Sequence, residues 1–250
     1  MRGEARLLSL ILRVGLLLAI GGQFLWSFRP AASAQLTVQA AEGEALFQAS
    51  CSTCHGVNAE GTPNGPSLQG VGPAAVDFML TSGRMPLAAP GDQPNRQAPR
   101  FRPAQIDAIV AYVATIAPGG PLIPAVDTSA GSLSAGSRLF LNNCSACHGA
   151  SAGGDSVGGG QIAPSLMPPT ATQIGEAIRI GPGVMPKFDE NNLSDADVNS
   201  IARYLVWLRS NGSEGGLQLG RVGAVAEGLV AFVVGLGLLL LAVRLSGSKV

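Results

Sequence analysis

The residues of this chain best suited to chemistry are its cysteines and histidines, which occur only in two short, matching runs. The chain has four cysteines and two histidines, and the runs that hold them are Cys51-Ser-Thr-Cys54-His55 and Cys144-Ser-Ala-Cys147-His148. In a C-x-x-C-H run the two thiols can reach the two vinyl groups of one porphyrin, and the adjoining imidazole can bind its iron. We therefore expect two covalently attached haem c groups, with the iron ligands His55 and His148.

Other uses of these residues remain open at this stage. Two cysteine pairs with two histidines could form a zinc site, although histidine rarely follows the second cysteine directly in such sites. A thioredoxin-like dithiol would need a βαβ setting, and no such strand pattern flanks either run. Two disulfides are also compatible with an exported protein. The duplication of the complete C-x-x-C-H run favours haem.

A haem iron held by one histidine needs a sixth ligand, and the chain has no further histidine. The thioether sulfur of methionine is the natural candidate. Met85 and Met185 occupy matching positions, each directly before a proline. We predict these two residues as iron ligands. Met79 and Met167 have no matching counterpart and are expected to pack in the core or in a loop.

Further residues are expected around the haem groups. A carbonyl oxygen that accepts a hydrogen bond from the ligating imidazole would orient that ring, and the carbonyls of Pro66 and Pro164 are candidates. A group of arginines lies near the first methionine in sequence and either meets haem propionates or forms a solvated loop. Its members are Arg84, Arg96, Arg100 and Arg102.

The similarity of the two halves extends beyond the cysteine runs. Gly43, Leu46 and Phe47 precede the first run as Gly136, Leu139 and Phe140 precede the second, and Pro-Ser-Leu follows both. Such self-similarity indicates a duplicated domain. The expected organisation is a signal peptide or anchor, a first haem domain, a linker, a second haem domain, a second linker and a membrane helix, at residues 1–34, 35–117, 118–134, 135–210, 211–221 and 222–243.

An all-α fold is predicted for both copies. Apolar residues recur at helical spacing in the last segment of each copy, and small Gly43 and Gly136 permit the close approach of another helix. Ser194 followed by Asp197 is typical of a helix N-terminus. The predicted helices are 40–50, 74–81, 105–116, 134–143, 171–180 and 197–208.

Both ends of the chain are apolar. The N-terminal segment has the order of a secretory signal: the basic residues Arg2, Arg6 and Arg13, then the apolar run 14–28, then Ala32-Ser33-Ala34 as a cleavage site. An uncleaved anchor is the alternative. At about 1.5 Å per residue, the stretch 222–243 exceeds the roughly 30 Å of a membrane's hydrocarbon core. Arg244 and Lys249 follow it, which places the C-terminus in the cytoplasm and the haem domains on the extracytoplasmic side. Charge is balanced, with 16 basic and 16 acidic residues, so no nucleic-acid surface is expected.

Three motifs shared by the two copies resemble those of tandem class I cytochrome c domains. They are G-x-x-L-F-x-x-x-C-S-x-C-H-G, P-S-L and M-P. The order of the segments and the loop 82–90 resemble more specifically the dihaem cytochrome cc subunit of bacterial menaquinol–cytochrome c reductase. That resemblance implies a respiratory electron relay in the cell membrane, within a translocating reductase, with no independent catalytic site. The implied partners are a cytochrome b subunit, a Rieske iron–sulfur protein, an aa3-type cytochrome c oxidase and membrane lipid. The alternative is a membrane-anchored dihaem subunit of another dehydrogenase or of a cbb3-type oxidase.

Overall fold

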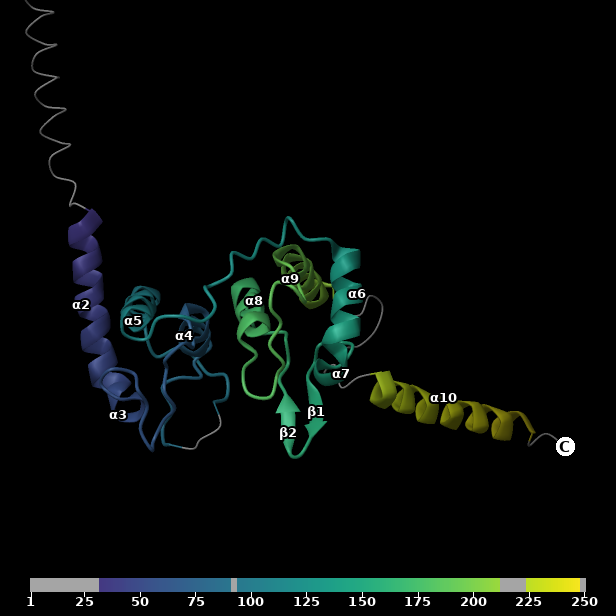
Figure 1. Ribbon diagram of the computed structural model, residues 1–250. Helices are drawn as coiled ribbons and strands as arrows, with labels where there is room; N and C mark the ends of the chain where they lie inside the picture. The colour runs from purple at the N-terminus through teal and green to yellow at the C-terminus, as the bar shows by residue number, and fades with distance from the viewer. Residues whose placement is uncertain (1–31, 91–93, 212–223, 248–250) are drawn as a thin grey trace, which may run out of the picture.

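The computed structural model describes residues 32–90, 94–211 and 224–247, and they are mostly helical (Figure 1). The first domain contains α2 (Ala32–Ser50), α3 (Ser52–His55), α4 (Pro73–Thr81) and α5 (Pro103–Ile116). The second contains α6 (Leu133–Asn143), α7 (Ser145–His148), β1 (Asp155–Gly158), β2 (Gln161–Ala163), α8 (Ala171–Ile180) and α9 (Asp195–Ser210). The last helix is α10 (Ala224–Gly247). The all-α prediction is confirmed. The proposed signal segment 1–31 lies outside the described residues.

Each domain is built on the crossing of its first and last long helices, α2 with α5 and α6 with α9. A Cβ atom added at Gly43 would lie 2.1 Å from the carbonyl oxygen of Ala108, and one at Gly136 would lie 1.9 Å from that of Ser200. Only glycine allows the backbones to come this close. The same crossing brings Phe47 to Tyr112 and Phe140 to Tyr204, with both pairs of ring centroids 5.6 Å apart.

Separate apolar cores fill the two domains. Phe47 and Phe140 are fully buried at equivalent places in them. Around Phe47 pack the apolar faces of α4 and α5, and around Phe140 those of α8 and α9. The helical spacing of apolar residues in the sequence therefore produces two similar cores. Ser194 accepts a hydrogen bond from the backbone N–H of Asp197 at 3.3 Å, as predicted for the start of α9.

A β-hairpin in the second domain was not predicted. Strands β1 and β2 pair antiparallel, with Asp155 opposite Ala163. They enclose the glycine-rich turn 158–160, whose residues all have positive φ. The hairpin explains why the loop after the second cysteine run is longer than its counterpart. Because its residues are mostly exposed, the sequence has no alternating apolar pattern that would predict it.

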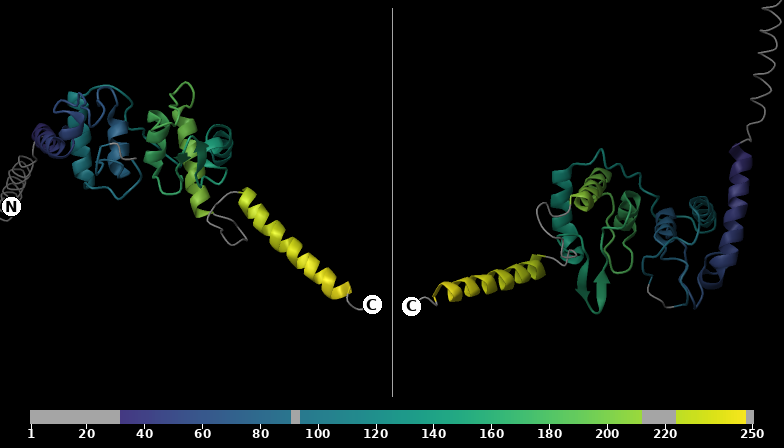
Figure 2. Two further views of the ribbon diagram at one scale, coloured as in Figure 1. Left: turned by 90° about the horizontal axis from the view of Figure 1, so that it is seen from below. Right: turned by 180° about the vertical axis from the view of Figure 1, so that it is seen from behind.

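The two domains meet through α4 and α8, which pack against each other (Figures 1 and 2). The segment between the domains is hydrogen-bonded to each of them. The Pro121 carbonyl accepts a hydrogen bond from the Ala74 N–H at 3.1 Å, and the Asp127 N–H donates to the Asn199 side chain at 2.9 Å. Helix α6 already begins at Leu133, so the end of the predicted linker, residues 133 and 134, lies in this helix. The linker thus contacts both domains.

Helix α10 stands apart from the two helical domains in all three ribbon views (Figures 1 and 2). Its stretch 228–247 is the one helix in the described part of the chain that is long and apolar enough to cross a membrane, and none of it is buried. An exposed apolar helix of this length is suited to a lipid environment and not to water.

Candidate haem sites

Each cysteine run forms a single helical turn directly after the first long helix of its domain. Cys51 caps α3 and Cys144 caps α7, and the backbone N–H of each bonds the carbonyl of Phe47 or Phe140 at 2.8 Å. The His55 and His148 N–H groups bond the carbonyl oxygens of Cys51 and Cys144, both at 2.9 Å. These bonds fix the backbone of each run relative to the first long helix of its domain.

Both histidine rings are oriented by a proline carbonyl, as predicted. Nδ1 of His55 donates to the Pro66 carbonyl at 2.7 Å, and Nδ1 of His148 donates to the Pro164 carbonyl at 2.9 Å. A carbonyl oxygen can only accept, so the hydrogen is on Nδ1 and the lone pair of Nε2 is free to bind iron. Burial lowers the pKa of His148, and the hydrogen bond to the Pro164 carbonyl opposes this effect.

The surroundings of the cysteines bear on the alternative chemistries. All four are free thiols, although each pair is close in sequence. Burial raises the pKa of Cys51 to about 11, and that of Cys144 also to about 11, with a smaller effect of Cys54 and Cys147. A reactive redox thiol typically has a lowered pKa, and neither Cys51 nor Cys144 has one. Among the described residues, no three His, Cys, Asp or Glu side chains come together to hold a metal ion. Four unpaired thiols, two in each run, fit haem attachment.

The structure brings each predicted methionine to the same core as the cysteine run of its domain. Cys51 and Met85 both pack against the core around Phe47, and Cys144 and Met185 both pack against the core around Phe140. Both methionines lie in loop turns that are held by backbone hydrogen bonds. The Met85 N–H bonds the Met79 carbonyl at 3.0 Å, and the Met185 N–H bonds the Pro182 carbonyl at 3.2 Å.

The four arginines near Met85 separate into two kinds. Arg84 and Arg96 are half-buried, whereas Arg100 and Arg102 are exposed. Arg102 precedes α5 and pairs with Gln105 at the start of that helix. Sequence reasoning missed Arg209 in the second domain, which lies near Arg96 and is also half-buried. No local pattern in the sequence relates Arg96 to Arg209, which are far apart in the chain.

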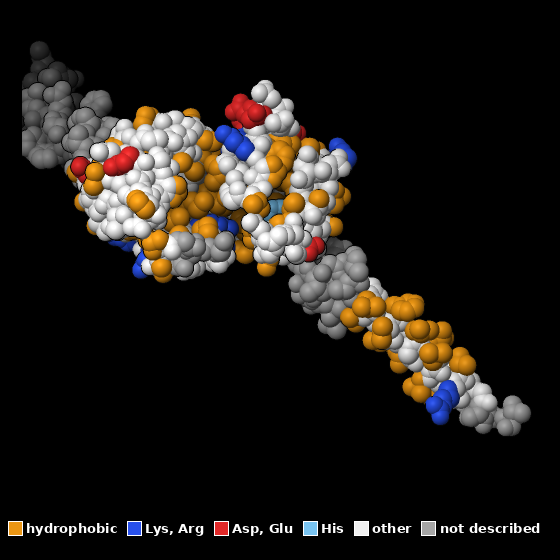
Figure 3. All heavy atoms as spheres, turned by 60° about the horizontal axis from the view of Figure 1, so that its bottom comes forward, with side chains coloured by type: hydrophobic (Ala, Val, Ile, Leu, Met, Phe, Trp, Pro, Cys, Tyr) orange, Lys and Arg blue, Asp and Glu red, His pale blue; other side chains and the backbone are white. Residues whose placement is uncertain are grey.

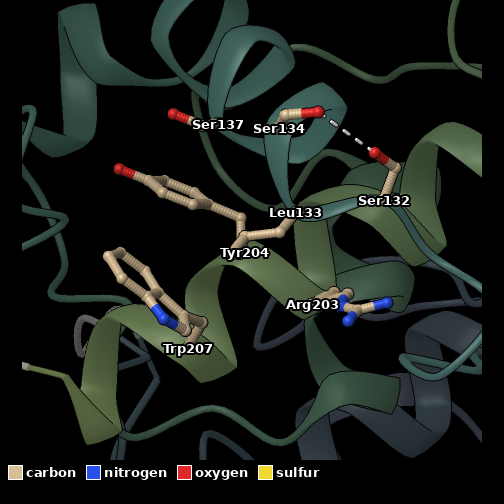
Figure 4. Close-up of a pocket in the computed structure, with 7 residues that line it drawn as sticks. All are labelled: Ser132, Leu133, Ser134, Ser137, Arg203, Tyr204 and Trp207. Atoms are coloured by element: carbon tan, nitrogen blue, oxygen red, sulfur yellow. Dashed lines mark hydrogen bonds between the residues drawn. The ribbon is translucent and has the colours of Figure 1, made fainter.

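A separate depression of about 600 Å³ lies on the outer side of the second domain (Figure 4). Tyr204 and Trp207 stack there at 6.1 Å between ring centroids, beside Arg203 and several serines. None of the residues that line it is a cysteine, histidine or methionine. This depression is therefore distinct from the haem sites. In the space-filling view, a histidine side chain is visible instead in a hollow lined by apolar side chains (Figure 3).

The fold and these sites define a c-type cytochrome with two haem domains, and comparisons with known proteins agree. Residues 40–117 match the family described as Cytochrome c. Residues 131–205 match the family described as Cytochrome C oxidase, cbb3-type, subunit III. The chain accordingly carries two covalently bound haem c groups, as expected from its cysteine runs.

Similar proteins identify the subunit family. The chain is 37% identical to the cytochrome bc1 complex cytochrome c subunit of Corynebacterium efficiens, over 87% of this chain and 80% of that protein. It is 38% identical to the corresponding Mycobacterium tuberculosis subunit, over 78% and 72% of the two chains. A cbb3-type cytochrome c oxidase subunit CcoP of Rhodobacter capsulatus is 30% identical over 65% and 60%. The chain belongs to the family of cytochrome bc1 complex cytochrome c subunits.

Proposed function

We propose that this chain is the dihaem relay of a menaquinol–cytochrome c reductase, which takes electrons from a Rieske iron–sulfur protein and delivers them to an aa3-type oxidase. The observation that carries the proposal is the duplicated site, in which each domain has a cysteine run, a carbonyl-oriented histidine and a methionine at one apolar core. Similarity to bc1 complex subunits over most of the chain supports the reductase as its setting.

The side chains of each site have defined roles in this proposal. Cys51 and Cys54 hold one haem through thioether bonds, and Cys144 and Cys147 hold the other. His55 with Met85, and His148 with Met185, bind the two irons. Bound haem supplies a carrier for one electron. The chain keeps the imidazoles fixed through Pro66 and Pro164 and surrounds both sites with apolar side chains, which limits the change in structure when charge arrives.

The position of the relay follows from its anchor. With α10 in the membrane and Arg244 near its C-terminal end, the haem domains lie at the extracytoplasmic surface and the C-terminus lies in the cytoplasm. The haem domains then remain close to membrane-bound electron donors and acceptors. The partners proposed for this surface are a cytochrome b subunit, the Rieske protein and the oxidase.

The test is purification of the membrane complex through a tag on this chain, followed by identification of its subunits by mass spectrometry. We expect a cytochrome b and a Rieske protein in stoichiometric amounts, and reduction of both haem c groups by a menaquinol analogue. Co-purification with the catalytic subunit of a cbb3-type oxidase, or with a dehydrogenase, would instead support the alternative assignment. The match of residues 131–205 to a cbb3 subunit makes that comparison informative.

A further inference from the structure

The amide side chain of Gln173, near the start of α8, forms hydrogen bonds to both haem domains. Gln173 is buried, with 4% of its surface exposed. Its Nε2 donates a hydrogen bond to Oγ1 of Thr81 on α4 at 3.1 Å. Its Oε1 accepts hydrogen bonds from Nη2 of Arg96 and, at 3.2 Å, from the backbone N–H of Thr170. Thr81 and Arg96 belong to the first domain, so this one side chain connects the two domains.

The partners of Gln173 admit one orientation of its amide. The Thr81 hydroxyl donates its hydrogen to the Asp77 carbonyl at 2.8 Å, so toward Gln173 its oxygen can only accept. The guanidinium of Arg96 and the N–H of Thr170 can only donate. The site therefore requires a donor on one branch of the side chain and an acceptor on the other, which an amide supplies. Leucine has a similar size but neither group.

Each side of this contact belongs to a helix that leads to a proposed methionine ligand. Helix α4 ends at Thr81, and its Met79 carbonyl accepts a hydrogen bond from the Met85 N–H at 3.0 Å. In the second domain, α8 contributes Ile178 to the core against which Met185 packs. The two helices pack against each other, whereas the two apolar cores share no residue (Figures 1 and 2). A shift of α4 against α8 would therefore change the separation of the two haem sites.

We propose that Gln173 is a positioning residue for electron transfer between the two haem groups. By holding α4 against α8, it fixes the distance that an electron must cross. The inference rests on the proposed relay, in which the same electron uses both haems. Removal of the amide would leave the buried partners of Gln173 without their hydrogen bonds and loosen the domain contact. Electron tunnelling falls steeply with distance, and a misplacement of about 1 Å can slow reacting groups by a factor of about 100.

The test compares forms of the full chain with both haems bound, purified in detergent without partner proteins. They are the unmodified protein, Gln173→Leu, Thr81→Val, the double variant and Gln161→Leu. Gln161 is the matched control, because it is an exposed glutamine of the same domain as Gln173. Pulsed electron paramagnetic resonance of the oxidised protein measures the distribution of haem–haem distances. Flash reduction by a ruthenium photoreductant, followed by transient absorption, measures the rate of electron exchange between the haems. Redox titration measures both potentials.

We expect broader distance distributions and slower electron exchange in both single variants, with unchanged potentials. The rate should fall roughly tenfold or more in Gln173→Leu. It should fall less in Thr81→Val, which keeps the hydrogen bond of Gln173 to Arg96. The double variant should exchange electrons no more slowly than Gln173→Leu, because the bond to Thr81 is already lost in that variant. Gln161→Leu should match the unmodified protein in all three measurements.

Three results would overturn the proposal. The first is unchanged distances and rates in both Gln173→Leu and Thr81→Val. The second is a change in only one of these two quantities, because positioning links the rate to the distance. The third is a double variant whose loss of rate is the product of the two single losses. If Gln173→Leu does not retain both haems, Thr81→Val against Gln161→Leu decides between the first two outcomes. Since no donor or acceptor protein is present, failure of the proposed function would leave these measurements unchanged.

Discussion

The carboxyl group of Glu176 on α8 lies against that of Asp77 on α4, although the two residues belong to different haem domains. Glu176 is fully buried. Neither of its carboxyl oxygens makes a hydrogen bond of normal geometry to a described residue. Burial first, and Asp77 second, raise the pKa of Glu176 from 4.5 to about 10. The domain contact thus contains a neutral carboxylic acid at physiological pH.

Glu176→Gln should stabilise the haem domains at alkaline pH. The folded protein keeps a proton on Glu176 that the unfolded chain releases above its ordinary pKa of 4.5. The stabilising effect of this group is therefore complete below that pKa and is lost as pH rises toward about 10. Glutamine is similar in shape and uncharged at every pH. We expect the variant to have a higher melting temperature than the unmodified protein at about pH 8, with a difference that shrinks toward about pH 5.

Glu190→Gln provides the control for this experiment. Glu190 is exposed in the same domain, so its replacement should leave the pH dependence of the melting temperature unchanged. Thermal unfolding followed by helical circular dichroism at several pH values compares the three proteins. If the melting temperatures of the Glu176→Gln variant and the unmodified protein changed with pH in the same way, Glu176 would not have a raised pKa.

Gly136→Ala should destabilise the second domain. Alanine at an ordinary helical position is favoured over glycine by roughly 1 kcal/mol. At Gly136, however, the added Cβ would lie 1.9 Å from the Ser200 carbonyl oxygen, so α6 and α9 must move apart. Overpacking of this kind typically costs about 1–3 kcal/mol, which exceeds the helix gain. We expect a lower melting temperature.

Gly237→Ala is the matched control for the helix crossing. It is also a helical glycine, but a Cβ atom there would meet nothing within 4 Å in the described structure. Its replacement should leave the unfolding of the haem domains unchanged. Equal melting temperatures for the Gly136→Ala variant and the unmodified protein would show that the two helices adjust to the extra methyl group without cost.

Local sequence patterns predicted the helices and the duplicated site because each depends on residues close in the chain. The positions of Gly43 and Gly136 indicated the close crossings, and Pro66 and Pro164 were identified as candidates to orient the histidines. The hairpin after His148 escaped prediction since its strands are short and exposed.

Contacts between the domains could not be predicted in the same way. The pairs Glu176 with Asp77 and Arg96 with Gln173 join residues that are far apart in sequence. They depend on how α4 packs against α8, for which a single sequence contains no periodic signal. A buried glutamate or an arginine with unpartnered nitrogens is visible only once the chain is folded.

Replacement of Met85 or Met185 by leucine should lower the reduction potential of one haem and open its iron to carbon monoxide. Methionine sulfur raises the potential of a histidine-ligated haem, and leucine has a similar size but no ligating atom. Since the methionines belong to separate cores, the other haem should remain nearly unchanged. Redox titration and carbon monoxide difference spectra measure both effects.

Met79→Leu and Met167→Leu serve as controls for the ligand assignment. Both methionines are half-buried, and we assign them to packing. The Met79→Leu and Met167→Leu variants should retain the reduction potentials and the spectra of the unmodified protein. One result would contradict the assignment: carbon monoxide binds to a Met79→Leu or Met167→Leu variant but not to the Met85→Leu or Met185→Leu variant of the same domain. Met79 or Met167 would then be the iron ligand.

The chain should conduct electrons without oxidising quinol itself. In the proposed sites, each iron has two protein ligands, so neither has an open position for a substrate. Helix α10 is apolar and unburied, and one helix alone cannot enclose a quinol. A fragment of residues 35–215, exported with a host signal, should therefore be soluble, keep both haems and accept electrons from artificial donors. Assayed with a menaquinol analogue beside the intact membrane complex, it should show little turnover. Turnover at the rate of the complex would mean that the haem domains carry their own quinol site and are more than a relay.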